Sequence, residues 1–467
     1  MQVTTEKFKS KAAEKTKDLV ARQRFRGATH HAVQSRNRAV EDILNWESLR
    51  EAAHRIKEFS IGHLADLLEE FERKATANGI KVYWAETDKE ACNYVLDLAR
   101  RIQASLIVKS KSMATEEIRL GHFLEEHGIE SVETDLGEFI VQLGGEGPSH
   151  IVTPAIHRNR DDIGKLFAER LGVPYSSDPE HLTGVAHDFL REKFLNAQIG
   201  ISGSNFAIAE TGDFVIIENE GNARLTTTLP RVHVAVIGIE KVIPRLEDLP
   251  TFLSILPRSG TGQKITSYVS VIHSPRHDGE IDGPEEVHVI LLDNGRSEIL
   301  ADPKMREVLY CIRCGACLNV CPVYQTVGGH SYGSVYSGPI GSALTPVLTS
   351  LEKAKDLPFA SSLCGRCSEV CPVKIDIHHL LLWLRRKSVQ ERLSSSAERL
   401  LMQTWCMIMR SPALYRFSSK MVRLLLPVLS RKNSSLPVPG WSKTRDFPPL
   451  APKSFKDLWP DVERESS

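Results

Sequence analysis

The chain has 467 residues, of which 41% are apolar, and its 59 basic residues balance its 59 acidic ones. This length and apolar fraction suffice for two or three packed domains, and the balanced charge gives no reason to expect nucleic acid as a partner. The N-terminus lacks the apolar core of an export signal and no stretch approaches the roughly 18–20 apolar residues of a membrane span, so a cytoplasmic protein without a span is expected.

Residues 1–78 are predicted to form a helical region that packs on the next part of the chain. Apolar residues recur there at intervals of three and four, for example Leu64, Leu67, Leu68 and Phe71, which is the period of an amphipathic helix. Gly79 comes directly after this pattern and is expected to end the last helix, because glycine commonly follows a helix.

Residues 79–300 are predicted to form one α/β domain. Short runs rich in β-branched residues alternate with amphipathic segments of helical length, which is the pattern of βαβ units and a parallel sheet. The strands expected in this sheet are 80–85, 105–109, 150–156, 199–202, 214–219, 233–239, 265–272 and 287–293. Helices are expected at 87–104, where Thr87 is the cap, at 114–127 and at 161–171, and a turn is expected at 293–297.

Polar and glycine-rich segments follow several of these strands, at 109–113, 134–138, 203–212 and 219–224. In open parallel sheets, the loops at the carboxyl ends of the strands form the ligand crevice. The candidate anion-binding residues are Lys109, Lys111 and Arg224, with hydrogen bonds from Ser110, Ser112, Asn205 and Asn222. A simpler alternative is that the glycines mark tight turns and the lysines are solvated. No G-x-G-x-x-G follows a strand and no Walker A motif occurs, so dinucleotide binding is disfavoured.

Residues 301–390 hold seven of the nine cysteines. The first motif is C-x2-C-x2-C-x3-C-P, formed by Cys311, Cys314, Cys317 and Cys321, and this is the run of bacterial ferredoxins that bind cubane iron–sulfur clusters. The second motif supplies Cys364, Cys367 and Cys371, with Ser361 where a first cysteine would stand.

The fourth cysteine of such a run ligates the other cluster in two-cluster ferredoxins. This rule predicts one [4Fe–4S] cluster on Cys311, Cys314, Cys317 and Cys371, and a second on Cys321, Cys364 and Cys367. The second cluster then lacks one thiolate. Its remaining corner could be closed by the hydroxyl of Ser361 or Ser362, by water, by Cys406 or by a partner protein, or the cluster could be [3Fe–4S]. Structural zinc is disfavoured because three cysteines at this spacing crowd one tetrahedral ion, and disulfides are disfavoured in a cytoplasmic chain.

The glycine-rich segment 327–341 lies between the two motifs and is expected to fold over a cluster, where its backbone N–H groups would contact sulfur. His330 in this segment is expected to form a hydrogen bond, with ligation as the rarer alternative. An apolar helix with a basic end is expected at 375–386. The two remaining cysteines, Cys92 and Cys406, lie on apolar helix faces, where a buried thiol acts as a small hydrophobe.

Residues 391–467 are predicted to form a basic helical tail followed by a proline-rich coil, LPVPGWSKTRDFPPLAPKSF. From Arg385 to Lys432 there are eleven Lys and Arg residues but only two acidic ones, Glu391 and Glu398. Such a surface favours an acidic partner or the anionic face of a membrane, and a solvated face is the simpler alternative.

Across nearly its whole length the chain carries a set of motifs that resembles the lactate utilization protein B family. These motifs read IVKSKSMATEEI, TDLGE, PSHIVTPAIH, NFAIAETG, NEGNARL, DNGRS, CIRCGACLNVCPVY, GGHSYGSVYSGPIG and SSLCGRCSEVCPVKI. The resemblance implies an iron–sulfur subunit of a bacterial system that oxidises L-lactate to pyruvate and supports growth on lactate. It implies that 79–300 is the domain shared by lactate utilization proteins, similar in fold to formyltetrahydrofolate cyclo-ligase.

The resemblance further implies two partners: a cysteine-rich subunit of the heterodisulfide-reductase type, and a small protein that carries the same α/β domain alone. It places cluster ligation on the same seven cysteines. The resulting hypothesis is a cytoplasmic electron-transfer subunit of an L-lactate oxidising complex, held peripherally at the inner membrane face if the basic tail meets lipid, with the electron acceptor unspecified. Two alternatives stay open at this point: a catalytic subunit that binds a carboxylate in the α/β crevice, and an assembly or redox-sensing protein.

Overall fold

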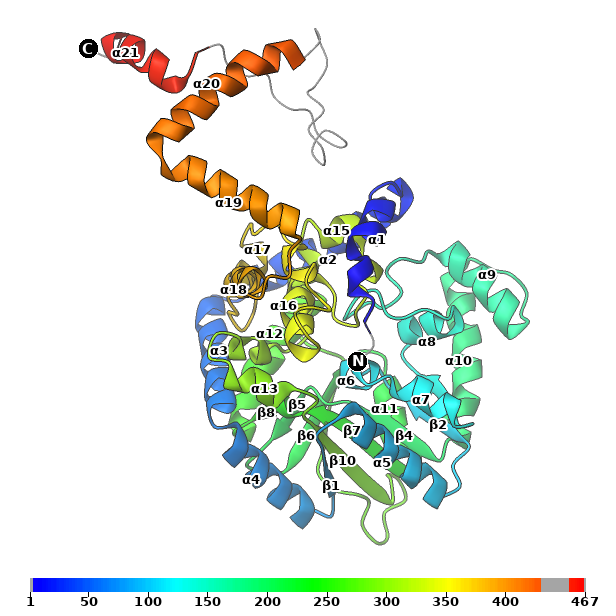
Figure 1. Ribbon diagram of the computed structural model, residues 1–467. Coiled ribbons are helices and arrows are strands. Elements are labelled where there is room, and N and C mark those ends of the chain that lie inside the picture. The colour runs from blue at the N-terminus through cyan, green and yellow to red at the C-terminus, as the bar shows by residue number, and fades with distance from the viewer. Residues whose placement is uncertain (1–2, 430–452, 466–467) are drawn as a thin grey trace. The chain divides into compact units, whose positions relative to one another are not determined.

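The computed structural model describes residues 3–429 and 453–465. The chain divides into two compact units, Met1–Glu391 and Arg392–Ser467. The first unit contains the α/β region and all seven clustered cysteines, and it begins with a short turn of helix at Thr5–Lys7 followed by four helices (Figure 1). These are α1 (Phe8–Lys15), α2 (Leu19–Glu41), α3 (Trp46–Gly62) and α4 (Leu64–Ala77).

The N-terminal helices form because their apolar residues repeat with the helical period and because their ends are capped. Asp18 accepts a hydrogen bond from the Ala21 backbone N–H at the start of α2. The apolar stripe of α4, from Leu64 to Ala75, is buried, and Gly79 has a φ of +87°, a conformation that favours glycine after a helix. Helix α2 packs on α12 (Leu249–Gly260) of the α/β region and on α14 (Ala316–Asn319) and α15 (Tyr324–Val327), which lie beside the cysteine motifs.

The main sheet has six parallel strands in the order β1-β10-β7-β4-β2-β3. Their bounds are β1 (Lys81–Ala85), β2 (Leu106–Lys109), β3 (Glu130–Glu133), β4 (Ile199–Ser202), β7 (Val232–Gly238) and β10 (Glu286–Leu292). The predicted parallel α/β architecture is confirmed. The central strands read as continuous apolar runs because both of their faces are covered, and every residue of β4 and β7 is buried.

Helices cover both faces of this sheet (Figure 1). Side chains alternate across β2: Ile107 belongs to the core beneath the helices at 88–101 and 120–126, whereas Leu106 and Val108 belong to the core beneath the helices at 136–143, 160–171 and 179–196. The helices of the α/β region are α5 (Asp88–Arg101), α6 (Met113–Glu117), α7 (Leu120–Glu126), α8 (Leu136–Leu143), α9 (Arg160–Leu171), α10 (Pro179–Asn196), α11 (Asn222–Thr228), α12 (Leu249–Gly260) and α13 (Arg296–Ala301), with 3-10 turns at Ile239–Lys241 and Leu246–Asp248.

Two predicted strands belong to a second sheet rather than to the main one. The segments 214–219 and 265–272 correspond to β6 (Asp213–Glu218) and β9 (Tyr268–Ile272), which form a four-stranded sheet of order β8-β5-β6-β9 with β5 (Phe206–Ile208) and β8 (Val242–Ile243). Residues 209–212, which join β5 to β6, are too few for a parallel connection, because parallel neighbours need a crossover of about a dozen residues. Strands β5 and β6 therefore pair antiparallel.

The segment 150–156, predicted as a strand, forms bends and turns instead. Pro154 has no backbone N–H to donate, and the N–H groups of Val152 and Thr153 both donate to the Nδ1 atom of His150. A side chain thus replaces a neighbouring strand as the hydrogen-bond partner. Sequence patterns also missed β3 and α10, although Asp178 followed by Pro179 is a recognisable helix start and does cap α10.

The cysteine motifs lie in a region of short helices within the first unit. These are α14 (Ala316–Asn319), α15 (Tyr324–Val327), α16 (Gly338–Leu348), α17 (Arg366–Glu369) and α18 (Ile377–Gln390), with 3-10 turns at Arg306–Tyr310, His330–Tyr332 and Leu357–Phe359. The segment 327–341 is irregular up to Gly338, where α16 begins, and the helix expected at 375–386 corresponds to α18.

The second unit consists of α19 (Ser396–Arg410), α20 (Pro412–Leu429) and α21 (Phe455–Glu465). The predicted proline-rich coil lies outside the described residues up to position 452, and the end of that segment belongs to α21. Among the described helices, none is both long enough and apolar enough to span a bilayer.

Candidate functional site

The first cysteine motif lies on a loop that is tightly packed against the α/β region. Cys311 follows a 3-10 turn, and α14 begins after Gly315, which has a φ of +77°. A Cβ atom at Gly315 would lie 3.0 Å from Val152 and 3.1 Å from His150, so glycine is needed both for the backbone angle and for the close approach. The loop 150–152, predicted as a strand, is thus the surface on which the cysteine loop rests.

Four cysteines from the two motifs converge on one small enclosed cavity, which is lined by Cys311, Cys314, Cys317 and Cys371 together with apolar side chains such as Ile151, Ile340 and Val373. Burial raises the pKa of the Cys314 thiol, and the neighbouring sulfurs of Cys371 and Cys311 raise it further. Burial likewise raises the pKa of Cys371 to about 12, with an added contribution from Cys311. The sequence block at 311–317 and the one at 364–371 therefore meet in space.

The other three cysteines form a second group. Burial raises the pKa of Cys321, and so does the nearby sulfur of Cys364. The pKa of Cys367 rises to about 11, first because of burial and then because of Cys321. Cys364 is exposed, so this group lies at the surface of the first unit, whereas the first group is enclosed. Burial is the main cause of the raised pKa of Cys317, and the neighbouring sulfurs, including that of Cys367, add to it. The two groups of cysteines are therefore neighbours.

The two sets of thiols are chemically suited to iron–sulfur clusters. Burial is the main cause of the raised pKa values of these thiols, and repulsion between neighbouring sulfurs adds to it. Bound iron would offset both effects by neutralising the thiolates. Backbone N–H groups also point at the sulfurs: those of Arg313 and Ile375 lie 3.4 Å from Cys311 Sγ and Cys371 Sγ. Such contacts to the sulfurs tune cluster potential. The residues present therefore fit two clusters, one with four and one with three cysteine ligands.

The alternative ligands for the second cluster lie in different places. The Ser361 hydroxyl accepts a hydrogen bond from the Leu363 N–H at 3.1 Å, within the same turn as Cys364. Cys92 is buried in the α/β core, and Cys406 lies exposed on α19 of the second unit. His330 Nε2 lies 2.8 Å from the carbonyl oxygen of Gly147, so its ring is used in a hydrogen bond to the α/β region.

The segment 327–341 lies beside both groups of cysteines. Ile340 lines the cavity of the first group, and the Cys321 sulfur contributes to the raised pKa of Tyr332 after burial. A Cβ atom at Gly329 would lie 1.7 Å from the Ser149 carbonyl oxygen, so the backbone of this segment is pressed onto the loop that precedes α9. The segment therefore lies next to the cysteines as expected, whereas the backbone N–H groups that contact the sulfurs of Cys311 and Cys371 belong to Arg313 and Ile375, outside it.

Two arginines of the N-terminal helices hold the second motif in place, and sequence patterns gave no signal for either. Arg50 on α3 donates to the carbonyl oxygens of Cys371 (2.8 and 3.0 Å) and Glu369 (2.8 Å). Arg36 on α2 donates to the carbonyl oxygen of Val370 at 3.2 Å. These carbonyls lie at and just after the end of α17, where a helix leaves carbonyl groups without partners inside the helix and where cations are favoured; the Cys371 carbonyl also accepts from the Lys374 N–H.

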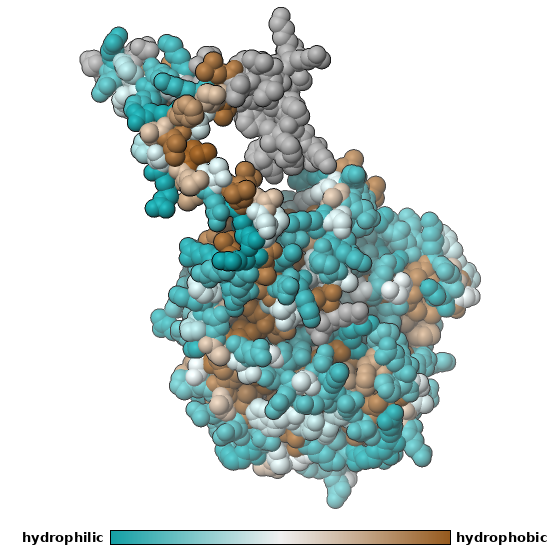
Figure 2. Space-filling model, viewed as in Figure 1, coloured by the Kyte–Doolittle hydropathy of each residue, from teal (hydrophilic) through white to brown (hydrophobic). Residues whose placement is uncertain are grey.

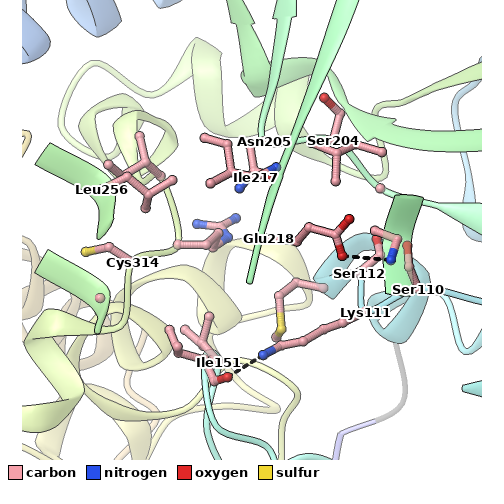
Figure 3. A pocket seen from close by; sticks show the side chains of 18 of the residues that line it. Ser110, Lys111, Ser112, Ile151, Ser204, Asn205, Ile217, Glu218, Leu256 and Cys314 are labelled. Atoms are coloured by element: carbon pink, nitrogen blue, oxygen red, sulfur yellow. Dashed lines mark hydrogen bonds between the residues drawn. The ribbon is translucent and has the colours of Figure 1, made fainter. Parts of the chain in front are cut away.

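A larger cavity of about 410 Å³ lies at the carboxyl ends of the parallel strands. Its lining includes four polar residues that the sequence placed in the crevice, namely Ser110, Ser112, Asn205 and Asn222. In Figure 3, Ser110 and Ser112 lie on one side of this cavity and Cys314 and Leu256 on the opposite side, with Asn205 between them. The cavity thus reaches from the sheet to a candidate cluster ligand.

The three cations predicted for this crevice are not brought together. Lys109 is buried outside the cavity lining, and its ammonium group lies 2.6 Å from Glu133 and 2.9 Å from Glu116. Burial acts to lower the pKa of Lys109, but these carboxylates raise it overall. Lys111 lines the cavity and donates to the Val152 carbonyl at 2.5 Å. Arg224 has an exposed side chain that is not part of the lining.

A buried charged network joins the crevice to the cysteine loop. Arg296 forms two hydrogen bonds of 2.9 Å with Glu117 and one of 2.6 Å with Glu240, and Arg313 lies 3.4 Å from Glu240. Tyr336 donates to Glu117 at 2.6 Å. Burial alone would raise the pKa of Glu240, but Arg296 and Arg313 lower it to about 2. Sequence reasoning missed this network, because its members lie far apart along the chain.

Comparison with known proteins gives three consecutive family matches: LUD domain over residues 68–292, 4Fe-4S dicluster domain over 307–375, and Lactate utilisation protein B, C-terminal, over 386–463. The chain is 44% identical over 469 aligned residues to proteins called Lactate utilization protein B from Bacillus thuringiensis (strain Al Hakam) and Bacillus cereus (strain AH187), with 99% of each chain covered.

Among solved structures, a DUF162 family protein from Deinococcus radiodurans matches with 12% identity and a TM-score of 0.29, covering 49% of this chain and 98% of that one.

Proposed function

The chain belongs to the lactate utilization protein B family, and on that basis we propose that it is the iron–sulfur electron-transfer subunit of a complex that oxidises L-lactate to pyruvate. The observation that carries the proposal is the convergence of seven cysteines from two motifs into two neighbouring groups, inside a region that matches the 4Fe-4S dicluster domain. Predicted family membership and an iron–sulfur role in lactate utilization are both confirmed by these matches.

In the proposed arrangement, Cys311, Cys314, Cys317 and Cys371 hold the first [4Fe–4S] cluster, and Cys321, Cys364 and Cys367 hold the second. Oxidation of lactate to pyruvate releases two electrons and two protons, and a pair of [4Fe–4S] clusters supplies two one-electron sites. The fourth corner of the second cluster is left to a ligand other than these seven cysteines.

The two groups of cysteines differ in how far the surrounding residues bury them. Cys314, Cys317 and Cys371 of the first group are buried, and Ile151, Ile340 and Val373 surround them, which limits the contact between water and their sulfurs to the side that adjoins the α/β crevice. Cys364 of the second group is exposed, so this group offers the shorter route to a partner. We propose that electrons pass between the complex and the second group at this surface.

We further propose two partners, a cysteine-rich subunit of the heterodisulfide-reductase type and a small protein with the same α/β domain. Support comes from α19 and α20, whose large apolar side chains are exposed, among them Leu400, Leu401, Trp405 and Phe417 (Figure 2). Exposed apolar surface of this kind marks a protein or membrane interface. The proposed location is the cytoplasm, at the inner membrane face if this surface meets lipid.

The test is anaerobic purification of the chain with the other proteins of its lactate utilization system, followed by addition of L-lactate. The proposal expects the visible and EPR spectra of this chain's clusters to show reduction by lactate when the partners are present and no reduction when the chain is alone. Clusters that stay oxidised in the assembled complex would refute an electron-transfer role and favour an assembly or redox-sensing protein.

A further inference from the structure

The crevice of the α/β region and the first cysteine loop share one cavity. Residues 312–314 line the same space of about 410 Å³ as the ends of β2 and β4. Figure 3 shows Cys314 at the edge of this space, opposite Ser110 and Ser112. Pockets of roughly 300–1,000 Å³ are typical of small-molecule sites. A molecule bound here would contact the sheet and the cluster loop at once.

Two cations line this cavity with donors that have no partner among the described residues. Lys241 stands at the end of a 3-10 turn, is partly exposed, and its ammonium group forms no hydrogen bond or salt bridge with the described part of the chain. The Arg313 side chain is only 8% exposed, and its buried Nη1 atom has no hydrogen-bond partner. A buried donor without an acceptor is costly, so each such group calls for an explanation.

Arg313 is held in position by the groups around it. Its guanidinium group lies 4.7 Å from the centre of the Tyr336 ring, and its Nη2 atom lies 3.4 Å from Glu240. Its backbone has a φ of +60°, which is uncommon for a residue other than glycine. The Cys311 sulfur also lies close to the guanidinium group. These contacts fix the side chain at the cavity wall, and its Nη1 atom has no hydrogen-bond partner among the described residues.

The other charged groups of the lining are already engaged. Arg296 is bound by Glu117 and Glu240, and Lys111 donates to a backbone carbonyl. Four carboxylates also line the cavity, and each already accepts hydrogen bonds: Asp135 and Glu220 from backbone N–H groups of α8, Glu218 from two backbone N–H groups of α11, and Glu240 from Arg296. The cations of the lining that remain for a ligand with negative charge are Lys241 and Arg313.

We propose that this cavity binds a small organic acid, with its carboxylate held by Lys241 and Arg313 beside the cysteine loop of the first cluster. A carboxylate matches the planar fork of an arginine and accepts charge-assisted hydrogen bonds from both cations. The choice of a 2-hydroxy or 2-oxo monocarboxylate as the class of acid rests on the proposed function; the anion site itself rests on the unpaired donors.

Binding at this place has an electrical consequence. The reduced cluster carries one more negative charge than the oxidised cluster, and net charge near a cluster sets its potential. A carboxylate next to Cys314 therefore disfavours reduction and lowers the midpoint potential of the first cluster. The second cluster, on Cys321, Cys364 and Cys367, has none of its cysteines in the cavity lining and serves as an internal reference.

The experiment uses the full chain with its clusters intact, under anaerobic conditions. Calorimetry measures binding of L-lactate, pyruvate and, as a general anion, inorganic phosphate, and a redox titration follows the first cluster with and without each acid. Replacing Lys241 by methionine removes one charge-assisted hydrogen bond, so binding should weaken by about 10- to 100-fold. The Lys241→Arg variant should restore most of the affinity.

The matched control is Arg224→Gln, which removes a cation that sequence alone placed in the crevice but that lies outside the cavity. It should leave binding unchanged. Iron content and spectra equal to those of the natural chain verify that each variant is folded. The potential of the first cluster should fall on binding in the natural chain and stay constant in Lys241→Met.

Three results would overturn the inference: no heat with either acid at millimolar concentration, equal affinity in Lys241→Met, or displacement of the acids by phosphate at equal concentration, which would contradict carboxylate recognition. Failure here differs from failure of the proposed function. Clusters reduced by lactate in the complex but indifferent to added acids in the isolated chain would refute only this site, whereas binding without reduction would refute only electron transfer.

Discussion

Cys371 links the two sequence blocks, because it is the one thiol from the second motif that joins the cavity of the first. Its sulfur lies near Cys311 and Cys314, far from both in sequence, and it is buried among apolar side chains. The proposed first cluster therefore depends on a contact that only the folded chain makes.

Replacing Cys371 by alanine should remove the first cluster and leave the second. With seven to eight irons expected for two clusters, the variant should retain about half, because a cubane with three ligands in an enclosed site is labile. Anaerobic iron and sulfide analysis measures this. The matched control is Cys92→Ala, a buried cysteine outside both groups, which should keep the full iron content. Equal iron in the two variants would contradict the assignment of ligands.

At the scale of elements, short α17 is positioned from outside rather than by its own length. A four-residue helix has no internal partner for most of its carbonyl groups. At its end, Arg50 of α3 donates to the carbonyls of Glu369 and Cys371, and Arg36 of α2 donates to that of Val370. The N-terminal helices thus act as a clamp on the second cysteine motif, which gives them a role beyond covering the sheet.

Replacing Arg50 by methionine should destabilise the first unit by about 2–3 kcal/mol, since buried carbonyls lose charged donors. It should also speed loss of iron to a chelator. Thermal unfolding and chelator kinetics measure the two effects. Arg55→Met is the control on the same helix: its side chain is exposed, and its ion pair among the described residues is with the partly exposed Glu51, so a change within about 0.5 kcal/mol is expected. Chelator kinetics in Arg50→Met equal to those of Arg55→Met would exclude the clamp.

At the scale of the whole molecule, the chain separates a folded unit that holds the candidate sites from a second unit with exposed apolar helices. None of the residues described in α19 is buried, although its apolar and polar residues are segregated along the helix. Such a helix is stable in proteins when its apolar face is covered. The second unit is therefore the part of the chain best suited to a partner.

Ending the chain after Glu391 should leave iron content and unfolding of the first unit unchanged, because both groups of cysteines and the apolar cores lie within it. The shortened chain should no longer co-purify with the other proteins of the system. Size-exclusion chromatography of the mixed components measures this. Retained association would place the interface on the first unit, and cosedimentation of the full chain, but not the shortened one, with anionic vesicles would assign the tail to lipid.

The sequence by itself determined the α/β architecture, the family and the two cysteine motifs, because alternating strands and helices and closely spaced ligands are local patterns. It assigned 214–219 and 265–272 to the wrong sheet and 150–156 to a strand that does not form, since apolar runs do not specify which neighbour satisfies their backbone. Lys109 shows the same limit: its position after a strand suggested a ligand, yet Glu133 and Glu116 bind its ammonium group. Only the tertiary structure brought Lys241 and Arg313 to one cavity beside Cys314, because whether a charge is paired depends on side chains that lie far away in sequence.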